Sequence, residues 1–88
     1  MPGNWPMLVL VANGRGATRF NALKKALPGV TSGALAPASK DLEAAGLLAR
    51  SLEPGFPPTT AYHLTIAGAA IFPLMDALIA AAARVPET

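Results

Sequence analysis

Apolar positions near the start of the chain predict an amphipathic helix. They recur at the i, i+3, i+4 and i+7 spacing of one helix face, at Trp5, Leu8, Val9 and Ala12. Pro6 suits the first turn, where its missing N–H would have no partner. Asn13-Gly14 is a typical helix stop, and a short loop with Arg15 follows it.

Two further apolar stripes, separated by one tight turn, predict a pair of helices. The first stripe consists of Phe20, Leu23, Ala26 and Leu27, with two lysines on the opposite side. We expect Asn21 to cap this helix and Pro28-Gly29 to end it. A second stripe at Leu35, Ala38, Leu42 and Ala45 predicts a helix over 31–45, capped by Thr31 and closed by Gly46 in the left-handed conformation.

Beyond residue 46 the pattern predicts two strands and a last helix. We expect strands at Leu47–Leu52 and Ala61–Ile66, joined by a protruding loop over 53–60 that is too long for a tight hairpin. Thr65 is the expected cap of a final helix with heptad-like apolar spacing, at Ile71, Met75, Leu78, Ala82 and Val85. The predicted fold class is α+β and mostly α, with a three-helix core and a two-stranded wing.

Length and composition limit the protein class. The 88 residues suit one domain, 1–88, because domains usually have about 100–200 residues. Hydrophobic residues make up 52% and charged residues 14%, which excludes intrinsic disorder. Without cysteine there is no disulfide and no thiol chemistry. The start of the chain does not resemble a signal peptide, so we expect a cytoplasmic protein. Residues 66–83 contain Pro73 and Asp76, which are costly in lipid, so we expect no membrane insertion.

The net charge of +2 is unevenly distributed. Residues 1–40 contain five cations and no acid, whereas residues 41–88 have a net charge of −3. A basic half on a small domain is a weak indication of a polyanionic partner. The same cations could also simply form a solvated face.

A helix pair with a short turn, followed by a two-stranded wing, is the pattern of a winged helix-turn-helix. Its second helix can lie in the major groove of double-stranded DNA. This hypothesis presents helix 31–45 to the groove and makes loop 53–60 the wing. Cations would contact phosphates, and Thr31, Ser32 and Ala36 would reach base edges. The candidate DNA-binding residues are Arg15, Arg19, Asn21, Lys24, Lys25, Thr31, Ser32, Ala36, Lys40, Thr59 and Thr60.

Several ordered motifs resemble the HxlR-type bacterial winged-helix regulators, relatives of the MarR group. They are Arg19-Phe20-Asn21-Ala22-Leu23, Leu27-Pro28-Gly29-Val30-Thr31 and the run from Lys40 to Arg50. Similarity continues through Pro57-Pro58, Tyr62-His63-Leu64-Thr65 and Gly68, so that it extends from about Trp5 to Leu78. The resemblance implies a homodimeric DNA-binding transcriptional regulator whose terminal helices form the dimer interface.

The chain departs from that family where DNA would be read. Pro37 lacks an N–H and clashes with the carbonyl four residues back, at a cost of ~3 kcal/mol, so the third helix should start late or be kinked. Ser39 stands where the family usually has a core leucine, and Thr59-Thr60 where an arginine is expected. The family's cysteine near the N-terminus is missing, so a thiol-sensing role does not transfer. A second hypothesis is therefore a winged-helix dimerisation or protein-interaction module without sequence-specific DNA binding.

Apolar residues lie nearly all round the last helix, which predicts a homodimer in which a partner covers the outer side. Residues 1–65 would then form the winged helix-turn-helix and 66–85 the dimerisation helix. In the wing, Phe56 is the one large apolar side chain, and we expect it to fold back onto the domain or a partner. The expected dimer interface consists of Trp5, Leu8, Ile71, Phe72, Leu74, Met75, Leu78, Ile79 and Val85.

No pattern in the sequence indicates catalysis. His63 is the one histidine, so a metal site would need carboxylates alone. The loop Gly14–Thr18 lacks the ending of a phosphate-binding loop and follows a helix. The remaining serines and acids form no local triad. We expect neither an enzyme nor a cofactor, and the sequence indicates no particular small-molecule effector.

Overall fold

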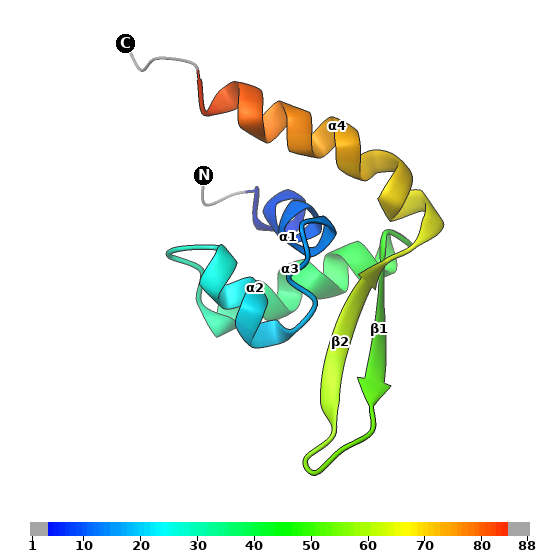
Figure 1. Cartoon of the computed structure of the whole chain (residues 1–88). Coiled ribbons are helices and arrows are strands. Elements are labelled where there is room, and N and C mark those ends of the chain that lie inside the picture. The colour runs from blue at the N-terminus through cyan, green and yellow to red at the C-terminus, as the bar shows by residue number, and fades with distance from the viewer. Residues whose placement is uncertain (1–3, 85–88) are drawn as a thin grey trace.

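The computed structural model describes residues 4–84 as four helices and one antiparallel hairpin (Figure 1). This order of elements and the mostly helical α+β class confirm the prediction. Within residues 4–84, no helix is long and apolar enough to cross a membrane. The elements are α1 (Trp5–Gly14), α2 (Phe20–Ala26), α3 (Ser32–Ala44), β1 (Leu48–Glu53), β2 (Thr59–Leu64) and α4 (Ile66–Ala82).

The centre of the fold is α1, which lies between α3 and α4 (Figure 1). Five consecutive residues, Val9–Asn13, are buried, because neighbouring elements cover this helix on more than one side. The predicted stripe was therefore too narrow, since it left Leu10 and Val11 outside. Leu23 of α2 and Leu35 of α3 complete the fully buried centre. The helix pair that carries the candidate interface is thus held on one hydrophobic core.

Local capping explains where α3 and α4 begin. The Thr31 hydroxyl accepts a hydrogen bond from the Ala34 N–H at 3.1 Å, and the Thr65 hydroxyl accepts one from the Gly68 N–H at 3.1 Å, as predicted. Gly46 has φ +75° after the end of α3, which confirms the left-handed cap. The cap predicted for α2 was wrong. Arg19, in an extended conformation, precedes that helix, and Asn21 lies inside its first turn.

Pro37 lies inside α3, which begins at Ser32, so the expected late start was wrong. Gly33 and Pro37 are both exposed, and the Gly33 carbonyl that would accept the missing N–H can therefore be hydrated. On the opposite face, Ser39 is 1% exposed, and its hydroxyl donates to the Leu35 carbonyl at 3.0 Å. Ser39, which stands in place of a core leucine, thus finds its hydrogen-bond partner within its own helix.

The hairpin pairs Leu48 with Leu64 at its base and Glu53 with Thr59 at its end. Both strands are offset from the prediction, and the loop contains only residues 54–58. Two β-branched residues, Thr59 and Thr60, extend β2 toward the tip. At the other end the Thr65 cap starts α4 at Ile66, so that residue is helical.

Candidate nucleic-acid interface

The hairpin is tied to the segment between α1 and α2 by a polar residue that sequence reasoning treated only as a helix stop. Asn13 is 5% exposed, and its side-chain amide donates to the carbonyls of Ala17 at 3.1 Å and Tyr62 at 2.8 Å. The Tyr62 N–H in turn donates to the Thr18 carbonyl at 2.8 Å. The sequence signal for the bridging role of Asn13 was its position four residues after Val9, on the apolar face of the helix. These bonds hold the hairpin beside the helix pair.

One face of α3 is free of contacts with the core. Leu35, Ala38, Ser39 and Leu42 form the buried face. Three side chains exposed on α3, Ser32, Lys40 and Asp41, can form hydrogen bonds, and the other exposed ones are small or apolar. Thr31 is also exposed, but its hydroxyl caps the helix. The residues exposed along the first part of α3 are Ser32, Gly33, Ala36, Pro37 and Lys40.

One lysine lies at the beginning of α3, and two others are exposed on the helix pair. Lys24 of α2 donates through Nζ to the Ser32 hydroxyl at 3.0 Å, which places its charge at the N-terminus of α3. Lys25 and Lys40 are exposed, as is Asn21. Within residues 4–84 these three lysines form no ion pair. Their charges are therefore available to an anionic partner.

Arg19 connects the helix pair to the wing. Its guanidinium forms an ion pair with Glu53 and a hydrogen bond with the Thr59 hydroxyl. Both charged side chains are about half exposed, so this ion pair contributes little to stability. Its effect is to add a polar contact between the start of α2 and the outer end of the hairpin. The structure thus brings together Arg19 and Thr59 from the predicted set, and the adjacent Thr60 pairs with Leu52 in the sheet.

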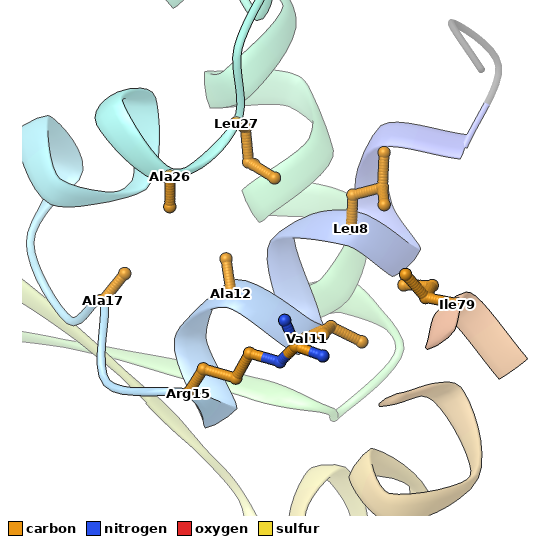
Figure 2. A pocket seen from close by; sticks show the side chains of 8 residues that line it. All are labelled: Leu8, Val11, Ala12, Arg15, Ala17, Ala26, Leu27 and Ile79. Carbon is orange, nitrogen blue, oxygen red and sulfur yellow. The ribbon is translucent and has the colours of Figure 1, made fainter. Parts of the chain in front are cut away.

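The structure separates Arg15 from the other predicted cations. Its Nε donates to a carboxylate oxygen of Asp76 in α4 at 2.7 Å. Figure 2 shows Arg15 at an apolar cavity of about 290 Å³, which Leu8 and Ile79 line on one side and Ala17 on the other. Because α4 lies across α1 from α3, this guanidinium is paired away from the exposed face of α3 (Figure 1).

The expected dimer residues divide into two groups. Trp5, Leu8, Phe72, Met75 and Ile79 pack against the core of their own chain, and Ile71 is half-buried. Phe72 lies so close to α1 that a Cβ at Gly14 would be 2.8 Å from its Cγ. Leu74 and Leu78 are 74% and 56% exposed. Val85 lies outside the described residues.

Phe56 contradicts the prediction that it folds back onto the domain. Its exposure is 106%, because the prolines on both sides of the loop hold the tip away from the core. Figure 1 shows the hairpin projecting from the helices on the side opposite α4.

A family model and several helix-turn-helix regulators match this chain. The HxlR-like helix-turn-helix model matches residues 1–87. An uncharacterized HTH-type transcriptional regulator of Methanothermobacter thermautotrophicus is 36% identical over 76 residues, which cover 86% of this chain and 58% of that protein. The HTH-type transcriptional regulator YtfH of Escherichia coli is 39% identical over 64 residues, 73% of this chain and 51% of that protein. The chain thus spans little more than half the length of these two relatives.

Solved structures have the same fold. The chain superposes on ytfH from Salmonella typhimurium with a TM-score of 0.77 at 36% identity, covering 86% of this chain and 68% of that one. The reduced form of the transcriptional regulator YodB from B. subtilis has a TM-score of 0.77 at 26% identity, covering 96% and 82%. These similarities support the winged-helix interpretation of the hairpin.

Proposed function

This chain belongs to the HxlR-like helix-turn-helix family, and we infer from that membership that it is a DNA-binding transcriptional regulator that acts as a homodimer. The observation that carries the inference is the exposed face of α3, with Lys24 at its beginning and Lys40 along it. In this function α3 enters the major groove. The loop 54–58 is the wing, and Arg19 contacts the strands that carry it.

Phosphate contacts supply most of the affinity in this proposal. Lys24, Lys25 and Lys40 have no ion-pair partner among residues 4–84, whereas Asp76 and Glu53 compensate the two candidate arginines. Three lysines per protomer correspond to a slope of log affinity against log salt of about −5 for a dimer, at about 0.9 per phosphate contact. The proposal therefore expects strong salt dependence.

Base reading is weak by comparison. The exposed face of α3 has no arginine, and a bidentate contact to guanine is worth about 1–3 kcal/mol of discrimination. Gly33, Ala36 and Pro37 offer no side-chain hydrogen bond to a base edge. This same observation favours the second candidate function, a dimeric protein-interaction module that does not read a DNA sequence.

A second copy of the chain would cover the outer face of α4. Ile66 and Leu74 are 93% and 74% exposed, although the helix is rich in apolar residues throughout. Exposed apolar patches of this kind mark protein interfaces, and obligate homodimers bury about 2,000 Å² or more. We expect light scattering at micromolar concentration to show a dimer, and a monomer would contradict the dimeric function.

Fluorescence anisotropy against genomic DNA fragments tests the DNA-binding function. We expect the parent to bind many fragments with the salt slope given above and with modest sequence preference. Combining Lys24→Ala with Lys25→Ala should weaken binding about equally on all fragments and reduce the slope to about −2. Arg84→Ala, which removes a cation just beyond the C-terminal end of α4, serves as the control and should change neither the affinity nor the salt slope.

Two results would count against this account. If the double lysine variant binds as well as the parent, the phosphate contacts are misplaced. If the parent binds no fragment in a salt-dependent way, the interaction module becomes the better function.

A further inference from the structure

The wing tip presents an aromatic side chain with no contact inside its own domain. Phe56 is 106% exposed, and it lies between Pro54 and Pro57-Pro58, whose rings fix the backbone φ angles. Leu52, on the same hairpin, is 70% exposed. Phe56 therefore contributes no packing to the described domain and is available at the end of a stiff arm.

This wing has no cation of its own with which to neutralise phosphates. Residues 51–60 contain no lysine and no arginine. The one charged group there, Glu53, is an acid whose charge Arg19 compensates at the base of the loop. What the tip can offer a duplex is an apolar ring. Proteins that approach the minor groove often insert apolar side chains, including Phe and Leu, between base steps.

We propose that Phe56 is a minor-groove wedge, which inserts between two base pairs beside the major-groove segment that α3 occupies. The inference rests on the proposed DNA-binding function and assigns a role to its wing. Two features support an inserted wedge. The hydrogen bonds that join Tyr62 to Asn13 and Thr18 hold the hairpin beside the helix pair, and the prolines limit the bending of its tip.

The area of the tip favours a wedge over a protein contact. A standard protein interface buries about 800 Å² on each partner, whereas one aromatic side chain buries about 150–250 Å². The apolar surface at the tip consists of that ring and the prolines of the five-residue loop 54–58. Such a surface is suited to one base step.

The test uses the whole chain and a short duplex that it selects from a random-sequence pool. One set of duplexes carries 2-aminopurine at successive flanking positions, because the fluorescence of this base rises when it is unstacked. Dyes at both ends of the duplex report bending. We compare the parent with Phe56→Ala and Phe56→Leu. Leu52→Ala is the matched control, since it removes an exposed apolar side chain from the strand below the tip.

We expect each protomer of the parent to unstack one flanking step, two per dimer, and the bound duplex to bend. Phe56→Ala should abolish both signals and lower affinity by about 10- to 100-fold for each of the two wedges, as removal of a side chain stacked on a base does. Its salt slope should not change, because a phenyl ring neutralises no phosphate. Phe56→Leu should retain part of the unstacking, and Leu52→Ala all of it. Thermal unfolding of Phe56→Ala should match the parent, because the ring has no contact to lose.

The outcomes separate the wedge from the function on which it rests. If the parent binds with the expected salt dependence but Phe56→Ala unstacks and bends the duplex equally, the wedge is wrong and Phe56 is left as a contact for a protein. If the parent selects no duplex, the proposed function fails and the wedge fails with it.

Discussion

Gly68 is where the start of α4 approaches the segment after α3 most closely. A Cβ at this position would lie 3.0 Å from the Leu47 carbonyl carbon and closer still to its oxygen. The obstacle is backbone, which cannot rotate away as a flexible side chain can. Gly68→Ala should therefore push the first turn of α4 off the segment that it contacts.

Three hydrogen bonds at this junction determine how much unfolding free energy Gly68→Ala should remove. The Thr65 N–H donates to the Leu47 carbonyl at 3.2 Å, the Thr65 hydroxyl donates to the Gly46 carbonyl at 2.6 Å, and the Gly68 N–H donates to that hydroxyl. Losing two of them costs about 2 kcal/mol, and overpacking adds about 1–3 kcal/mol. The better helix propensity of alanine offsets about 1 kcal/mol. The expected net destabilisation is about 2–4 kcal/mol, which lowers Tm by roughly 10 °C or more.

Urea unfolding followed by far-UV circular dichroism measures this difference. Protein concentration must be held constant, because dimerisation makes apparent stability concentration-dependent. Gly33→Ala is the matched control, since Gly33 is a helical glycine whose Cβ would be 3.8 Å from the Thr31 hydroxyl oxygen. It should raise stability by about 0.5–1 kcal/mol. If both variants are at least as stable as the parent, the close approach of α4 to Leu47 is refuted.

Three further changes test other parts of the structure. Asn13→Ala leaves the buried Tyr62 carbonyl without its side-chain donor, so unfolding free energy should fall by about 2–3 kcal/mol in urea titrations; a change near zero would contradict this bridge. Leu78→Asp should yield a folded monomer by light scattering and circular dichroism, because this side chain is 56% exposed in one chain; a persistent dimer would place the interface elsewhere. Pro37→Arg restores a helix N–H and adds an exposed cation, so DNA affinity should rise and the salt slope should steepen by about 2; weaker binding would show that α3 does not face the phosphates.

Local chemistry explains why most of the elements could be predicted from the sequence. Thr31 and Thr65 cap the helices that follow them, and Gly46 adopts the left-handed conformation, as predicted. These features depend on atoms within a few residues of one another, so they are encoded in short stretches. The family resemblance likewise rests on ordered motifs at these turns. Strand ends were less accurate, because cross-strand pairing extended β2 to Thr59.

Tertiary structure decided what each candidate site residue contacts. Arg15 pairs with Asp76, 61 positions away, and Arg19 pairs with Glu53, 34 positions away. Neither pairing leaves a periodic signal in the sequence, so both arginines were predicted as free phosphate ligands. The burial of Asn13 and the exposure of Phe56 likewise depend on how distant segments pack, which leaves no periodic signal in the sequence. The sequence determined which helices and strands form, whereas their packing determined which charges are compensated and which apolar side chains stay in water, because those depend on atoms brought together only by the fold.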